Sequence, residues 1–82
     1  MTAQVIDVRQ ANEYQAGHVP DALNVELGSI ATAELPTGVL TIMCGHGERA
    51  MTAASILTAR KDISVLAGGP TDWATATGNA LA

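Results

Sequence analysis

One segment, VLTIMCGHGERAMTAASIL (Val39 to Leu57), carries a short apolar run followed at once by a helical pattern. The run from Val39 to Met43 is typical of a core strand, and from Ala50 onward small and apolar residues recur at the spacing of a helix face. The single cysteine of the chain, Cys44, stands between the two. The segment therefore predicts a strand, a tight loop and a helix, with the thiol where the strand ends.

The loop between this strand and helix is rich in glycine. We expect Gly45 and Gly47 to take positive φ angles, so that successive backbone N–H groups point at one spot and form an anion-binding nest. A helix N-terminus stabilises an anion by about 0.3–1 kcal/mol, and each charge-assisted hydrogen bond adds about 1–2 kcal/mol. Such a loop can hold a thiolate on Cys44 without a base beside it. A lone cysteine is more often a small buried hydrophobic residue, but this setting favours a functional thiol.

Short apolar strands alternate with helical stretches along the rest of the chain. Strands are predicted near Gln4 to Val8, Leu23 to Val25, Gly38 to Met43 and Ile63 to Leu66, and helices near Asn12 to Ala16, Ala50 to Arg60 and Pro70 to Thr77. The weakly patterned stretch from Leu27 to Pro36 fits a short helix followed by a turn. This alternation predicts an α/β fold, a small open and mostly parallel sheet flanked by helices on both faces. Ligands of such sheets bind at the carboxyl ends of the strands, where Cys44 is expected.

Length, charge and composition narrow the classes of partner. The 82 residues allow one domain with a thin core. A net charge of -4, one Trp, one Tyr and no Phe argue against a basic groove or a stacking platform, so no nucleic acid is expected. No apolar run approaches the roughly 20 residues of a membrane span, and the N-terminus lacks a signal-peptide pattern. One cysteine cannot form an internal disulfide, and a lone reactive thiol fits a cytoplasmic location.

Three motifs follow one another along the chain: VIDVRQANEYQAGHVPDALNV (Val5 to Val25), CGHGER (Cys44 to Arg49) and VLAGGPTDW (Val65 to Trp73). In this order they resemble the rhodanese-like domain, the single-domain type of sulfurtransferase. The first resembles the opening strand with its Asp and Arg, the acidic-aromatic pair and the Gly-His-x-Pro turn of that family. The second resembles its catalytic loop, and the third its last strand, Gly-Gly turn and tryptophan-bearing helix.

The resemblance covers nearly the whole chain and implies one rhodanese-like domain over residues 1–82, either as a whole protein or as one module of a longer protein. Two departures accompany it. Asp21 stands where a small glycine is usual, and the chain begins almost directly at the first core strand.

The spacing of the loop bears on the chemistry, because Arg49 stands five residues after Cys44. Cysteine phosphatases and their arsenate-reducing relatives place the arginine one residue further along, and their longer loop encloses a tetrahedral anion. The shorter loop resembles that of the sulfurtransferases, whose ring of amides fits the terminal sulfur of a cysteine persulfide.

The resemblance implies that Cys44 takes sulfane sulfur from thiosulfate or a persulfide donor and passes it to a thiol or cyanide acceptor, with no metal or organic cofactor. A second class stays open, in which the domain is a docking module. It would then carry or sense persulfide for a fused or separate partner in a sulfur relay.

The polar residues of the loop have two interpretations each. His46 and Arg49 are expected at the rim, where they steer anionic donors, unless Arg49 anchors the loop through a carboxylate. Glu48 partly cancels the positive field there, so that a less charged persulfide should be handled better than the dianion thiosulfate; otherwise it is a plain acid at a helix N-terminus. The expected site is the catalytic Cys44 with a substrate-binding loop of Gly45, His46, Gly47, Glu48 and Arg49.

A second group of polar residues lies outside the loop. Asp7 and Arg9 stand two residues apart at a strand end and so face the same side. With Glu13 and His18 they are expected to form a structural polar network that supports the site. Two histidines, one cysteine and scattered acids do not show zinc-ligand spacing, and Trp73 is expected to anchor the core.

Overall fold

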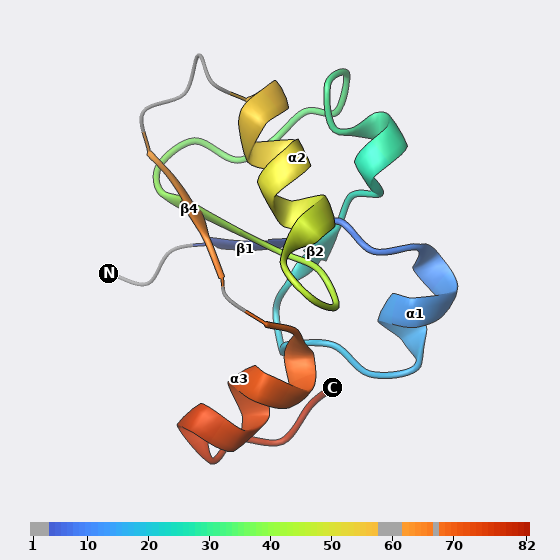
Figure 1. The fold of residues 1–82 in the computed structure, drawn as a ribbon, viewed down its shortest axis with the longest axis vertical. Coiled ribbons are helices and arrows are strands. Elements are labelled where there is room, and N and C mark those ends of the chain that lie inside the picture. Colours follow the sequence, from blue (N-terminus) through green and yellow to red (C-terminus); the bar gives the residue numbers. More distant parts are fainter. Residues whose placement is uncertain (1–3, 58–61, 67) are drawn as a thin grey trace.

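The computed structural model of the chain describes residues 4–57, 62–66 and 68–82. Along them the elements are β1 (Gln4–Asp7), α1 (Ala11–Gln15), β2 (Leu23–Asn24), the 3-10 helix η1 (Leu27–Ser29), β3 (Leu40–Met43), α2 (Glu48–Ile56), β4 (Ile63–Val65) and α3 (Pro70–Thr77) (Figure 1). Helix α2 has nine residues, whereas a membrane span needs about 20. No helix of the described residues is long and apolar enough to cross a bilayer.

The strands form one parallel sheet in the order β2-β1-β3-β4. In its register Ile6 of β1 lies beside Ile42 of β3, and Ile42 lies beside Val65 of β4. Because the strands are parallel, their carboxyl ends share one edge, and the segments that follow them meet there. The α/β fold predicted from the sequence is confirmed.

Alternation along the strands divides the core between the two faces of the sheet. On one face Ala50 and Ala53 of α2 pack against Ile6, Leu40 and Ile42, with η1 beside them. On the other face Met43 packs with residues near α1 and α3, namely Val19, Ala22, Tyr14 and Trp73. Helices therefore cover both faces, and Trp73 contributes to the second core as a partly buried side chain rather than a fully buried one.

The predicted boundaries differ from the observed ones mainly at α2. This helix begins at Glu48, two residues before the predicted start at Ala50, because Gly47 with a φ of 92° forms its N-cap and the first turn is polar. It ends at Ile56, with Leu57 as C-cap, short of the predicted Arg60; residues 58–60 lie outside the described ones. The strands are one or two residues shorter than predicted, and α1 starts and ends one residue earlier. Helix α3 has the predicted bounds.

Asp21 is the one non-glycine residue with a positive φ, 66°, in the part of the chain that the structure describes. This left-handed conformation costs most L-residues roughly 1–2 kcal/mol, and Asp and Asn tolerate it best. The geometry explains why a glycine suits this position. The side chain of Gln4 donates a hydrogen bond to the Asp21 carbonyl, 2.8 Å away, and so ties the turn to the start of β1.

Candidate active site

Cys44 follows the last residue of β3 and lies at the carboxyl edge of the sheet. Its side chain is only 1% exposed and belongs to the core cluster that contains Ala50 and Ala53. The strand end is held in place because the Val8 N–H donates to the Met43 carbonyl at 2.9 Å. The sulfur therefore lies between a fixed strand and the first turn of α2.

Two backbone N–H groups point at the sulfur. That of Gly47 lies 3.0 Å from Cys44 Sγ, and that of Ala50 lies 3.4 Å from it. Gly47 has a φ of 92°, which a residue with a side chain rarely adopts. The expectation of a positive φ at Gly45 is wrong, because its φ lies outside that region. What distinguishes Gly45 is that its carbonyl lies close to Gly69.

Arg49 lies in the first turn of α2, at the end of the loop motif, and reaches to α1, where it binds Glu13. Its Nη1 lies 2.7 Å from Oε1 of Glu13 and its Nη2 lies 3.1 Å from Oε2, so the pair is bidentate. The guanidinium also passes over the loop, because a methyl group on Gly45 would lie 3.5 Å from Nη2. Arg49 thus has the carboxylate contact that one of its two expected roles, anchoring the loop, requires.

Hydrogen bonds keep both partners of this pair charged. The hydrogen bond from Arg49, followed by that from the Gln10 N–H, lowers the pKa of Glu13 from 4.5 to about 2. In return, the hydrogen bond to Glu13 raises the pKa of Arg49. The two side chains are 36% and 37% exposed, so the solvent screens the pair and its contribution to stability is below about 1 kcal/mol.

The expected network of Asp7, Arg9, Glu13 and His18 is divided into three separate contacts. Arg9 binds both carboxylate oxygens of Asp7, a side chain that is 0% exposed, and donates to the Gly17 carbonyl. Glu13 binds Arg49 instead, through both of its carboxylate oxygens.

His18 takes no part in either ion pair. Its ring stacks on Tyr14 at 3.7 Å between centroids, and its Nδ1 lies 2.9 Å from the Tyr14 carbonyl. The Tyr14 hydroxyl in turn donates to the Ala22 carbonyl at 2.6 Å. His18 therefore packs the connection between α1 and β2, and the prediction of one shared network is wrong.

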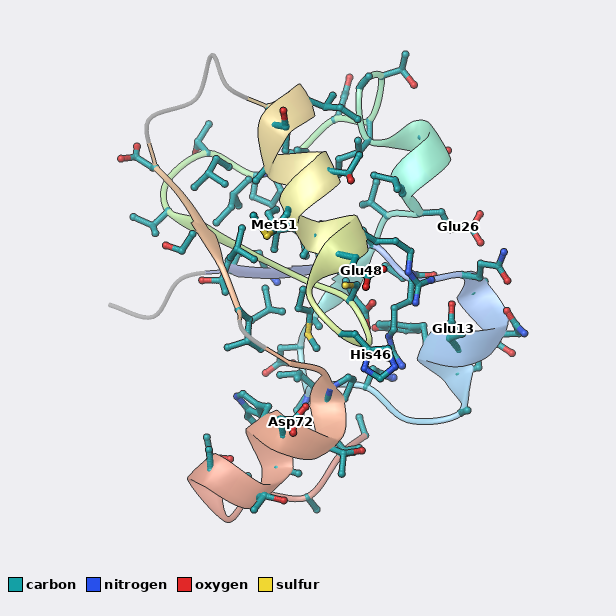
Figure 2. All side chains as sticks on the ribbon, viewed as in Figure 1. Glu13, Glu26, His46, Glu48, Met51 and Asp72 are labelled. Atoms are coloured by element: carbon teal, nitrogen blue, oxygen red, sulfur yellow. The ribbon has the colours of Figure 1, made fainter. Side chains whose placement is uncertain are left out.

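Two cavities border the loop. One of about 320 Å³ is lined by Arg49 and Glu26, among others. The other, of about 300 Å³, is lined by His46 and Glu48 together with apolar atoms of Met51 and Val65. Figure 2 shows Glu13, His46 and Glu48 around the start of α2, with Glu26 close by. His46 and Glu48 are exposed at the rim, and the described residues hold no group of three His, Cys, Asp or Glu side chains that could bind a metal ion.

Gly69 is not among the residues expected at the site, yet it lies against the loop. A methyl group on Gly69 would lie 2.5 Å from the Gly45 carbonyl and 3.2 Å from the Cys44 carbonyl. The position therefore needs glycine for lack of space. Its N–H donates to Asp72 at 2.8 Å, which caps α3. In the sequence, only the Gly-Gly motif of VLAGGPTDW indicates a tight turn here. It does not tell that this turn approaches the backbone of the Cys44 loop.

Comparisons with known proteins found a matching family model and several similar sequences. A family model described as rhodanese-like domain matches residues 1–76. The thiosulfate sulfurtransferase GlpE of Pseudomonas savastanoi pv. phaseolicola is 32% identical over 77 residues, covering 87% of this chain and 72% of that protein. A tRNA sulfurtransferase of Thermoplasma acidophilum is 31% identical over 58 residues, covering 71% of this chain and 12% of that protein.

Solved structures show the same fold. A rhodanese-related protein from Thermoplasma volcanium matches with a TM-score of 0.83 at 21% identity, over 98% of this chain and 83% of that one. A human single-domain sulfurtransferase matches with a TM-score of 0.77 at 24% identity, over 89% and 81%.

The amide contacts to sulfur predict different effects for the two glycines of the loop. Gly47→Ala should slow alkylation of Cys44 by iodoacetamide at neutral pH about tenfold, because it strains the backbone and turns one N–H away from Sγ. Gly45→Ala is the matched control, since its φ is ordinary and the added methyl meets only the end of the Arg49 side chain. Equal rates in the two variants would mean that the Gly47 N–H does not activate the sulfur.

The close approach of Gly69 predicts that Gly69→Ala destabilises the fold by about 1–3 kcal/mol, because the methyl must push the Gly45 carbonyl aside. The rate at which iodoacetamide alkylates Cys44 should change as well, because the displaced carbonyl belongs to the loop around the sulfur. Urea unfolding measures the first effect, with Gly28→Ala as control, since a methyl there meets nothing within 4 Å. A stability like that of the wild type in Gly69→Ala would contradict the close contact.

The lowered pKa of Glu13 predicts how the Glu13–Arg49 pair depends on pH. A carboxyl with a depressed folded-state pKa stabilises the fold above its ordinary pKa of 4.5, and this contribution is lost as the pH falls toward about 2. The free energy of unfolding of the wild type minus that of Glu13→Gln should thus be constant at neutral pH. It should shrink as the pH falls from 4.5 to about 2. Glu34→Gln, in the exposed connection before β3, is the control. A difference that stays constant down to pH 2 would refute the pairing.

Proposed function

Because the chain belongs to the family of rhodanese-like domains, we propose that it transfers sulfane sulfur through a persulfide on Cys44. The observation that carries the proposal is the pair of N–H groups, from Gly47 and Ala50, aimed at Sγ where β3 ends. The names of the relatives, which are sulfurtransferases, support the class of reaction.

The reaction has two steps, both at sulfur. The Cys44 thiolate attacks the outer sulfur of the donor, an S–S bond forms, and the old bond of that sulfur breaks. The leaving group departs with the electron pair, as sulfite from thiosulfate or as a thiolate from a persulfide. A thiolate or cyanide acceptor then attacks the outer sulfur of the Cys44 persulfide, and Cys44 leaves as a thiolate.

The backbone N–H groups stabilise negative charge on sulfur in both steps. They donate to Sγ of Cys44 whenever it is a thiolate, before the first step and after the second. Since the groups belong to a loop pinned by Arg49 and Gly69, they need no rearrangement during the reaction.

A carrier of persulfide is the second candidate. The chain has no second cysteine, so the outer sulfur must leave by attack from another molecule. An enzyme would complete many cycles with thiosulfate and cyanide, whereas a carrier would load one sulfur and release it only to a protein acceptor.

The proposal predicts that Cys44→Ser abolishes sulfur transfer but leaves the fold intact, because a hydroxyl fits the loop and is a poor nucleophile toward sulfane sulfur. The intact-protein mass of the wild type should increase by one sulfur atom after incubation with thiosulfate or glutathione persulfide, and that of Cys44→Ser should not. Urea unfolding of the variant controls for folding. Sulfur transfer at the wild-type rate in Cys44→Ser would end the proposal.

A further inference from the structure

Arg49 is the cation that an anionic donor would meet at the loop. Of the four Lys and Arg residues of the chain, the described ones are Arg9 and Arg49. Arg9 is buried and bound to Asp7 and to the Gly17 carbonyl. Within the described part of the chain, Arg49 is therefore the guanidinium or ammonium group left at the Cys44 loop, with the imidazole of His46 exposed beside it.

Glu13 already occupies the binding face of this guanidinium. Both terminal nitrogens of Arg49 donate to it, in the fork geometry that Arg also uses for sulfonate-like and phosphate-like groups. A thiosulfate dianion therefore has to displace Glu13 before it can bind this paired face of Arg49.

Glu13 is also held where it competes. Its Oε1 accepts a second hydrogen bond, from the Gln10 N–H at 3.1 Å, which fixes the side chain along α1. Its pKa of about 2 keeps it ionised at neutral pH. The carboxylate therefore cannot vacate Arg49 by taking a proton.

The cavities beside the loop reinforce this selection. Glu26 lines the cavity next to Arg49, and Glu48 lines the other. A doubly charged donor meets a carboxylate in either cavity; Figure 2 labels both residues. The second cavity also offers apolar atoms of Met51 and Val65, which suit an alkyl group.

We propose that Glu13 is a specificity residue, which holds Arg49 away from dianions so that the site takes a sulfane donor with at most one negative charge. An alkyl persulfide or a thiosulfonate fits this description better than thiosulfate. The inference rests on the proposed sulfur transfer and names the donor class of the same site.

The test compares thiosulfate with methanethiosulfonate, a monoanion that delivers the same sulfane sulfur and leaves as methanesulfinate. With cyanide as acceptor and at low salt, the wild type should favour the monoanion. Glu13→Gln should shift the ratio of the two kcat/KM values about fivefold toward thiosulfate, because it frees Arg49. The double variant Glu13→Gln/Arg49→Ala should lose that shift.

Two further variants distinguish the release of Arg49 from a general change in the electrostatic potential at the loop. Glu48→Gln removes the same charge from the loop without touching Arg49, and should shift the ratio less than half as much. Glu34→Gln, distant from the loop in sequence and exposed, should leave the ratio unchanged. An unchanged ratio in Glu13→Gln, an equal shift in Glu48→Gln, or a shift that survives loss of Arg49 would each overturn the inference.

A second readout does not need turnover. Sulfate, an unreactive dianion, should protect Cys44 from iodoacetamide in Glu13→Gln but not in the wild type, and absence of protection in both would overturn the role of Glu13. Should Glu13→Gln fail to fold, Glu13→Asp serves, since its shorter side chain cannot keep both hydrogen bonds. If neither donor adds sulfur to Cys44 in any variant, the proposed function fails, and the donor inference fails with it, whatever sulfate does.

Discussion

The carboxyl edge of the sheet depends on the buried ion pair between Asp7 and Arg9. Arg9 donates to both oxygens of a carboxylate that has no exposed surface, and removing one partner of such a pair costs about 3–5 kcal/mol. The pair thereby fixes the segment after β1. From that segment the Val8 N–H donates to the Met43 carbonyl, so the position of Cys44 depends on a buried contact outside the loop.

The sequence alone predicts most of the fold, because the signals are local. The apolar run before Cys44 and the small residues from Ala50 onward have the periods of a buried strand and of a helix covering it. The alternation of strands and helices also predicts parallel strands, although not their order, β2-β1-β3-β4. At Asp21 the sequence showed only a departure from the family's glycine, and the structure adds the left-handed turn that explains why glycine suits this position.

The arrangement of the site could be predicted only in part, because its contacts join distant segments. Glu13 and Arg49 are 36 residues apart, and nothing in the pattern around Glu13 tells whether it binds Arg9, as the sequence suggested, or Arg49. Gly45 and Gly69 resemble any turn glycines in the sequence. The structure separates them. Gly45 does not need a positive φ, whereas Gly69, at the start of α3, has no room for a side chain beside the Gly45 carbonyl.

In the electrostatics of the site, short-range hydrogen bonds and long-range charge act in different ways. Backbone N–H groups stabilise charge on sulfur at about 3 Å, a short-range effect that salt barely weakens, whereas attraction by a free cation acts over a Debye length of about 8–10 Å and is screened. Because Glu13 neutralises Arg49, the short-range term dominates at Cys44, and the net charge of -4 repels anions from a distance. The loop is thus suited to stabilise an anion formed on its own cysteine while it attracts few anions from solution.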